Sequence, residues 1–263
     1  MKNKVIKRDV KTGDTIFNQR SLEKDFRTLI PSIKKGMHVL DVGCATGAIS
    51  AGIAKMVGSK GSVTGIDHTK AFIDNGQTAF AEVKNLDLLH ADIFTFEPNQ
   101  EYDLIVSARV LQWLSTPEKA LRKMKDLLKP NGQISILDYN HTALEFTPKP
   151  PKSMQVFYTK WLQWRSDAGM NNQISESLSV YFKNIGLKNI EVEVSNELYE
   201  KGQPNFESKV GIWSKVANST QMIKEGYMKK EEQQLVIKEF NDWIKDSAER
   251  MEMKLKEVRG WNE

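Results

Sequence analysis

The feature that most constrains this chain is an apolar run that passes through a glycine turn into a helix. Residues 37–42 are mainly apolar and predict a buried strand, and residues 48–57 carry apolar side chains at helical spacing. Gly43 and Gly47 stand in the turn between them. Such a turn presents free backbone N–H groups and the positive end of a helix dipole to a ligand. The stretch therefore predicts an anion or nucleotide site in an α/β protein.

The turn departs from the two common nucleotide fingerprints. Positions 43, 45 and 48 read Gly, Ala and Ala, whereas the dinucleotide motif G-x-G-x-x-G has glycine at all three. No lysine follows Gly47, so the Walker pattern fails as well. The residues Asp-Val-Gly-Cys-Ala-Thr-Gly at 41–47 instead resemble motif I of the class I S-adenosylmethionine-dependent methyltransferases. In that family the middle glycine is often varied, as Ala45 is here.

Four later segments follow in the order and at the spacing of the same family. Residues 61–68 read as a second strand that ends in Asp67, and residues 86–93 read as a third strand that ends in Ala-Asp-Ile. Residues 102–114 resemble the fourth strand with its following turn, and residues 127–137 resemble the turn into strand five. The resemblance covers positions 39 to about 139. Within the family, the chain is similar to small-molecule enzymes.

The resemblance implies an α/β, Rossmann-like fold. Alternating strands and helices over residues 36–139 predict parallel strands with right-handed crossovers. We expect a seven-stranded, mostly parallel sheet in the order 3-2-1-4-5-7-6, with helical insertions after strands five and six. Strand seven is placed at residues 251–258, where Met251, Met253 and Leu255 alternate, and it is expected to be antiparallel. A continued charged helix is the alternative for this last segment.

Four regions are expected along the chain. Residues 1–35 form an N-terminal helical cap segment, with one helix over 15–33, and residues 36–139 form the cofactor-binding core. Residues 140–172 form a helical insertion that serves as a substrate lid. Residues 173–263 complete the core and contain a second helical insertion at about 199–246.

The resemblance also implies where S-adenosyl-L-methionine binds. The methionyl part is expected on residues 41–47, the ribose on Asp67 and the adenine near His68, Asp92 and Ile93. Arg20 is a candidate partner for the methionyl carboxylate, with a plain surface arginine as the alternative. The expected cofactor residues are Arg20, Asp41, Gly43, Cys44, Ala45, Gly47, Asp67, His68, Ala91, Asp92, Ile93, Ser107, Ala108 and Gln112.

Methyl transfer from a sulfonium depends on positioning, so no catalytic triad is required. The candidate bases are His141 and Tyr139, because they follow strand five, where strand ends open onto the ligand crevice. A structural role is the alternative for His141. The turn at 107–110 lacks the Asn/Asp-Pro-Pro-Tyr/Phe motif usual in enzymes that methylate base amino groups or glutamine amides. This favours a small-molecule acceptor.

Large aromatic side chains in the first insertion predict a pocket wall made of Phe157, Trp161 and Trp164. Trp164 falls off the apolar stripe set by Met154, Trp161 and Leu162, so one helix face can pack while another lines an apolar pocket. Packing of all three against the second insertion, or a dimer contact, is the alternative.

The composition of the chain limits which classes of binding partner are expected. Thirty-eight basic and 34 acidic residues give a net charge of +4, which does not by itself predict a nucleic-acid partner. No apolar run approaches the roughly 20 residues that span a bilayer, and the single cysteine suits a reducing cytoplasm. We expect a cytoplasmic enzyme with a small-molecule substrate, no metal, and no DNA or membrane partner; a homodimer stays open. The alternative class is a non-catalytic or regulatory S-adenosylmethionine-binding module that acts through a protein or RNA partner.

Overall fold

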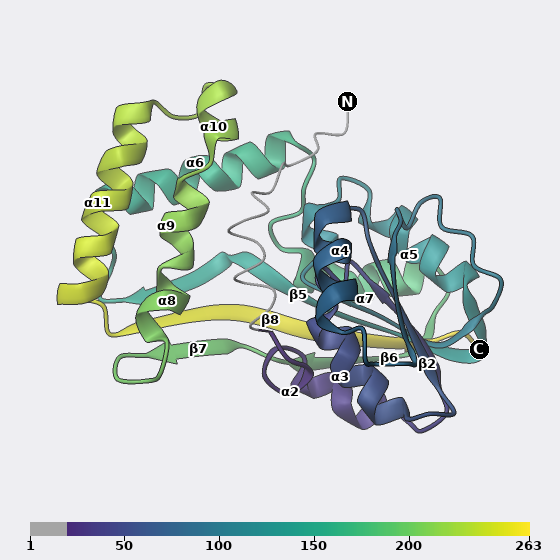
Figure 1. Cartoon of the computed structure of the whole chain (residues 1–263). Coiled ribbons are helices and arrows are strands. Elements are labelled where there is room, and N and C mark those ends of the chain that lie inside the picture. The colour runs from purple at the N-terminus through teal and green to yellow at the C-terminus, as the bar shows by residue number, and fades with distance from the viewer. Residues whose placement is uncertain (1–19) are drawn as a thin grey trace.

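One eight-stranded sheet runs through the computed structural model, which describes residues 20–263 (Figure 1). The strands are β1 (His38–Val42), β2 (Ser62–Asp67), β3 (Leu86–His90), β4 (Tyr102–Ala108), β5 (Leu128–Thr147), β6 (Lys188–Val194), β7 (Glu197–Glu200) and β8 (Arg250–Trp261). Their order is β3-β2-β1-β4-β5-β8-β6, and β8 runs antiparallel to β5 and β6. The predicted order is confirmed, with β8 in the place expected for strand seven, between β5 and β6. The helical alternative for the C-terminal segment is wrong.

An additional strand distinguishes the observed sheet from the predicted one. The short β7 pairs with the first part of β8, from Glu197 opposite Met253 to Glu200 opposite Arg250. The prediction of seven strands missed it because four residues carry too little alternation to separate a strand from a loop.

Helices cover both faces of the sheet. The 3-10 helix η1 (Arg27–Ser32), α2 (Leu22–Asp25) and α3 (Ala48–Val57) share a hydrophobic cluster on one face, and α5 (Pro117–Asp126) and α7 (Ile174–Asn184) share the cluster on the other. Helix α4 (Lys70–Ala79) lies against β2 and β3 (Figure 1). No helix within residues 20–263 combines the length and the apolar character that crossing a bilayer requires.

The N-terminal helix differs from the prediction. Residues 15–19 of the expected helix lie outside the described residues, and from Arg20 onward the expected single helix is wrong. Helix α2 ends after four residues at Asp25. The next residue, Phe26, has φ −147° and ψ 41°, outside the helical region, and η1 contains Pro31. Phe26 is almost completely buried, so its ring packs into the core at the cost of helical continuity.

A long ribbon of β5 and β8 carries the sheet beyond the core. Strand β5 continues to Thr147, past the expected end near Tyr139, and pairs with β8 from Gln133 opposite Trp261 to Thr147 opposite Arg250. A bulge interrupts the pairing between Asn140 and Glu145. Above the ribbon lie α6 (Lys152–Asp167), α8 (Phe206–Val210), α9 (Ile212–Ala217), α10 (Thr220–Lys224) and α11 (Lys230–Asp246), which we name the helical lobe (Figure 1).

The helical lobe has no core of its own. Val39 and Leu137 of the sheet belong to the same hydrophobic cluster as Trp213 and Phe240 of the lobe. Phe240 stacks on Trp243 at 5.3 Å, and Phe146 of β5 meets both rings edge-on at 5.9 and 5.8 Å. The lobe and the sheet are therefore packed as one body.

Candidate active site

The turn after β1 has a backbone that favours glycine. Gly43, Ala45 and Gly47 have φ values of +76°, +51° and +79°. A Cβ at Gly47 would lie 2.7 Å from Leu88 Cδ1, and a Cβ at Gly43 would overlap the side chain of Val110. Both glycines are needed for conformation and for space within the protein.

Two buried acids hold this turn. Asp67, at the end of β2, accepts hydrogen bonds from the backbone N–H groups of Ala45 at 3.0 Å and Thr69 at 2.8 Å. Asp41 accepts a hydrogen bond of 2.6 Å from Ser50 Oγ. Burial raises the pKa of Asp41 to about 6, and the nearby Asp67 adds to the effect. The acids thus connect β1, β2 and α3 around the turn.

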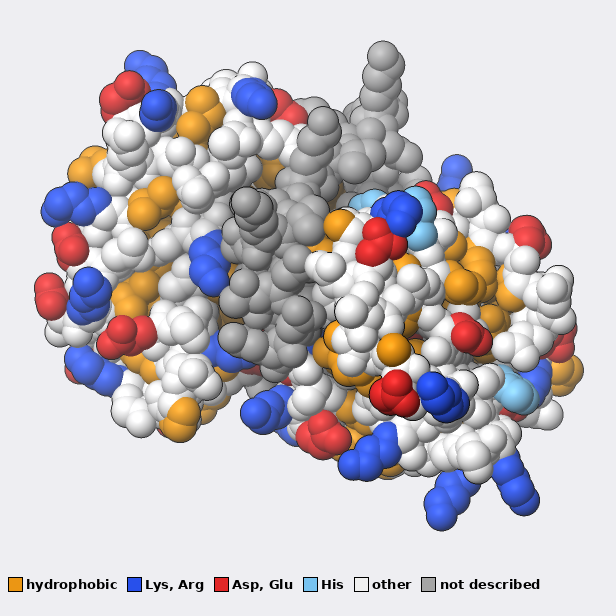
Figure 2. Space-filling view, viewed as in Figure 1, with side chains coloured by type: hydrophobic (Ala, Val, Ile, Leu, Met, Phe, Trp, Pro, Cys, Tyr) orange, Lys and Arg blue, Asp and Glu red, His pale blue; other side chains and the backbone are white. Residues whose placement is uncertain are grey.

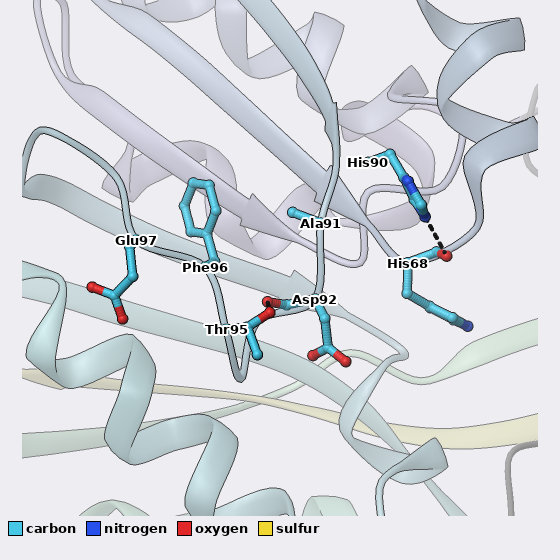
Figure 3. Close-up of a pocket in the computed structure, with 7 residues that line it drawn as sticks. All are labelled: His68, His90, Ala91, Asp92, Thr95, Phe96 and Glu97. Atoms are coloured by element: carbon cyan, nitrogen blue, oxygen red, sulfur yellow. Dashed lines mark hydrogen bonds between the residues drawn. The ribbon is translucent and has the colours of Figure 1, made fainter.

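A cavity of about 490 Å³ opens at His68, the residue that follows Asp67 (Figure 3). The Nε2 atom of His90 lies 3.1 Å from the backbone oxygen of His68, and Asp92 Oδ1 accepts a 2.9 Å hydrogen bond from the N–H of Phe94. Ile93, expected here, is instead buried in the core cluster beneath α5 and α7. The cavity is lined by His68, His90, Ala91, Asp92, Thr95, Phe96 and Glu97.

Two of the expected cofactor residues, Ser107 and Gln112, form hydrogen bonds within the protein. Ser107 Oγ donates to the carbonyl oxygen of Val42 at 2.8 Å and joins β4 to β1. The backbone N–H of Gln112, in η2 (Leu111–Trp113), donates to Asp138 Oδ2 at 3.0 Å. The side-chain Nε2 of Gln112 donates to the carbonyl oxygen of Arg109 at 3.2 Å.

His141 lies in the bulge of β5. Its backbone N–H donates to Asn172 at 2.8 Å instead of to β8, and its ring Nε2 contacts Gln112 Oε1. Because the amide nitrogen of Gln112 is already a donor, this oxygen accepts from Nε2–H, and Nδ1 is the basic nitrogen. Burial lowers the pKa of His141 well below its usual value, and the charge of Arg165 lowers it further. His141 is therefore neutral at physiological pH.

Aromatic rings surround His141. Tyr139 lies 5.1 Å, Trp161 5.0 Å and Trp213 6.3 Å from the imidazole, measured between ring centroids. Trp161 also stacks on Tyr158 at 5.5 Å. Of the three aromatic residues expected to form a pocket wall, Trp161 is the one that lies against His141.

The other two expected wall residues point elsewhere. Phe157 is buried in the cluster shared by the sheet and the helical lobe. The indole N–H of Trp164 donates to Glu225 Oε2 at 2.9 Å, at the end of α10. This is the contact with the second insertion that the alternative interpretation of these aromatics requires.

Arg109, which immediately follows β4, was not among the expected site residues. It has a φ of +62°, and 4% of its side chain is exposed. Its Nε donates to Tyr139 Oη at 2.9 Å and its Nη2 pairs with Glu197 of β7. Its Nη1 is buried and has no hydrogen-bond partner among residues 20–263. A buried donor of this kind costs about 1–3 kcal/mol, more when charged.

The neighbours of Arg109 have fixed protonation states. Burial raises the pKa of Tyr139, which is thus a phenol at neutral pH. Burial opposes ionisation of Glu197, but the charge of Arg109 outweighs it and the pKa of Glu197 falls below its usual value. Arg20 is close enough that burial, followed by the charge of Arg109, lowers its pKa. The expected residues Arg20 and Tyr139 are thus brought together with Arg109.

Arg165 joins the helical lobe to this region. Its guanidinium lies between the rings of Trp113 and Trp161, 4.6 and 4.7 Å from their centroids. Its Nη2 donates to the carbonyl oxygen of Gln112 at 2.8 Å, and its Nε donates to Asn172 Oδ1 at 2.7 Å. An arginine in a helical pattern gives no signal of such a contact, so the sequence did not identify it.

Known proteins share parts of this sequence and its fold. A family model described as a methyltransferase domain matches residues 33–203. A demethylmenaquinone methyltransferase of Staphylococcus aureus (strain MRSA252) is 33% identical over 132 residues, which are 49% of this chain and 53% of that protein. The chain thus spans about half the length of this relative.

Two solved structures share the fold. An S-adenosylmethionine-dependent methyltransferase from Aquifex aeolicus superposes with a TM-score of 0.55 at 20% identity, over 98% of this chain and 100% of that one. A phosphoethanolamine N-methyltransferase from Haemonchus contortus, in complex with phosphomonomethylethanolamine and S-adenosylhomocysteine, gives a TM-score of 0.55 at 15% identity, over 89% of this chain and 51% of that one.

Proposed function

Because the chain belongs to the methyltransferase domain family, whose model matches residues 33–203, we propose that it transfers the methyl group of S-adenosylmethionine to a small-molecule acceptor beside His141. One observation carries the proposal. The glycine turn lies between the two halves of the site. On one side are Asp67 and the cavity of about 490 Å³. On the other side Gly43 lies against Val110, and Gln112, two residues later, contacts His141.

The residues around the turn fit the cofactor. Residues 41–47 would hold the methionyl part, Asp67 the ribose hydroxyls, and His68, Ala91 and Asp92 the adenine. Each oxygen of Asp67 accepts one backbone hydrogen bond and retains a lone pair for a ribose hydroxyl. When bound, S-adenosylmethionine supplies an electrophilic methyl group on its sulfonium.

The chain's own groups would prepare the acceptor. The neutral His141 can take a proton from a hydroxyl through Nδ1, and Gln112 fixes the ring orientation. The rings of Tyr139, Trp161 and Trp213 exclude water around it. An acceptor with a flat, apolar body suits these walls, which agrees with the named substrate of the Staphylococcus aureus relative.

The setting of the reaction is part of the proposal. We propose that the enzyme is cytoplasmic, because its single cysteine suits a reducing compartment. The proposal allows either a monomer or a homodimer. On the face shown in Figure 2, outside the grey atoms, basic and acidic side chains are interspersed instead of forming one basic patch. This supports a small-molecule acceptor over a nucleic acid.

Cofactor binding and transfer can be tested together. Asp67→Ala should weaken S-adenosylhomocysteine binding in calorimetry about 10- to 100-fold, because a charged hydrogen bond is worth about 1.5–3 kcal/mol. Asp87→Ala, on the exposed side of β3, is the matched control and should bind as the wild type does. Equal affinity in the Asp67 variant would show that the ribose assignment is wrong.

Methyl-labelled cofactor incubated with a metabolite extract should yield a labelled product with the wild type and not with Asp67→Ala. A protein that binds S-adenosylhomocysteine but labels no metabolite would favour the non-catalytic module instead.

A further inference from the structure

We propose that Arg109 binds an anionic oxygen of the methyl acceptor, a carboxylate or a phenolate, through its Nη1. Tyr139 and Glu197 hold the guanidinium in place for this contact. The proposal rests on the proposed function, since it concerns the acceptor of the same reaction.

The backbone of Arg109 is strained, and its neighbours maintain the strain. Its φ of +62° is unusual for a residue with a long side chain. The N–H of Arg109 donates to Leu137 at 2.7 Å, and its carbonyl accepts from the side chain of Gln112 at 3.2 Å. Strain that the surroundings enforce in this way is found mainly at functional sites. The side chain of the next residue, Val110, lies against Gly43, so the backbone of Arg109 lies close to the cofactor turn.

The guanidinium is fixed but incompletely satisfied. Nε and Nη2 are engaged by Tyr139 and Glu197, while Nη1 is buried without a partner among the described residues. Glu197 is itself held by a 3.0 Å hydrogen bond from Tyr199. A planar arginine fork whose other nitrogens are held offers its remaining N–H groups to one ligand oxygen at little cost in entropy.

The surrounding charges keep the guanidinium of Arg109 positive. Arg20 and Arg109 both act on Glu197. Asp25 acts on both arginines as well, more than Glu197 does on Arg20 and less than Glu197 does on Arg109. Two arginines thus face two carboxylates, and Nη1 of Arg109 is a buried donor without a partner among residues 20–263.

The position of this donor relative to His141 indicates the acceptor. The guanidinium carbon of Arg109 lies 5.6 Å from the centre of the Tyr139 ring, and the ring of His141 lies 5.1 Å from the same centre. A flat molecule lying along Tyr139 can therefore present its anionic oxygen to Arg109 and its reactive atom to His141.

The test uses full-length protein saturated with S-adenosylhomocysteine. Benzoate, 4-nitrophenolate and the neutral benzamide are titrated while tryptophan fluorescence is recorded, since Trp161 and Trp213 lie beside the site. At least one anion should bind about tenfold more tightly than benzamide, the factor expected for a charge-assisted hydrogen bond. Preference for benzoate identifies a carboxylate, and preference for 4-nitrophenolate identifies a phenolate.

Variants assign the preference to Arg109. Arg109→Gln should abolish it, Arg109→Lys should retain part of it, and Arg122→Gln, on the exposed face of α5, should leave it unchanged. If Arg109→Gln does not fold, Tyr139→Phe keeps every charge and should lower anion affinity about three- to tenfold. No anion preference in the wild type, or full preference in Arg109→Gln or Tyr139→Phe, overturns the proposal. Failure of the wild-type protein to bind S-adenosylhomocysteine would refute the proposed function instead.

Discussion

At the scale of single residues, burial decides which groups of the site carry a proton. It lowers the pKa of His141 and raises the pKa of Tyr139. It raises the pKa of Asp138, which caps η2 through the N–H of Gln112, to about 6. At neutral pH His141 is therefore unprotonated, Asp138 is mostly ionised, and Tyr139 keeps its hydroxyl hydrogen for Glu197.

The raised pKa of Asp41 predicts a pH-dependent effect on stability. Since its folded-state pKa of about 6 exceeds the unfolded value, the folded protein binds more protons between about pH 4 and pH 6. The free energy of unfolding thus falls as pH rises through this window. Asp41→Asn should be the more stable protein at about pH 7.5, by up to about 3 kcal/mol, and the difference should vanish below about pH 4. Urea unfolding across this range measures it.

Asp103 provides a control of opposite sign. Burial opposes its ionisation, but hydrogen bonds from the His38 N–H and Lys129 outweigh burial and lower its pKa. Asp103→Asn should therefore destabilise the protein at neutral pH, and the loss should shrink as pH falls through the folded pKa. A pH-independent gain in Asp41→Asn would show that the mutation acts through packing.

At the scale of elements, the glycine turn and β3 are coupled by contact. Gly47→Ala would place a Cβ 2.7 Å from Leu88 in addition to the cost of positive φ, so the two sites should interact in a double-mutant cycle. Combined with Leu88→Ala, the loss should be smaller than the sum of the single losses by about 1 kcal/mol or more. Gly47→Ala should also weaken S-adenosylhomocysteine binding.

Gly58 is the matched control for this cycle. It has a similar φ of +68°, and nothing lies within 4 Å of an added Cβ. Gly58→Ala should therefore cost only the conformational term and show no coupling to Leu88→Ala. Additive losses of stability in the Gly47 cycle would mean that the Leu88 side chain moves away from the added Cβ without an energetic cost.

The elements also show what the sequence could predict. The cofactor turn is local, so its motif located it, and the strand order followed from family spacing. The bulge at 140–145 breaks the two-residue alternation of β5, which hid the second half of that strand. Arg109 and Glu197 are 88 residues apart, and Arg165 is 53 residues from Gln112. Such pairings exist only once the tertiary structure has formed.

At the scale of the whole molecule, the shared hydrophobic cluster predicts cooperative unfolding. Tryptophan fluorescence, to which the helical lobe contributes four of the six tryptophans, and far-UV circular dichroism should give coincident urea transitions. Phe240→Ala should lower both midpoints equally, with a loss of about 3–5 kcal/mol, because it leaves a cavity in the shared core. Leu235→Ala, 51% exposed on the same helix, should change stability by less than about 0.5 kcal/mol. A separate early transition of the lobe would contradict the single core.

The junction of β7 and β8 has a consequence for how enzymes of this architecture can diversify. The N–H of Lys201 donates to Glu249 at 2.8 Å, so the chain departs for α8–α11 and returns at two neighbouring positions. The segment between them can be replaced without shifting the register of the sheet, provided that its replacement restores the buried contacts that Val236 and Phe240 make in the shared cluster. A graft that keeps an apolar surface toward α6 would alter the acceptor side and leave the cofactor turn intact. Under the proposed function, acceptor preference would then be exchanged as a module, while the cofactor turn is inherited unchanged.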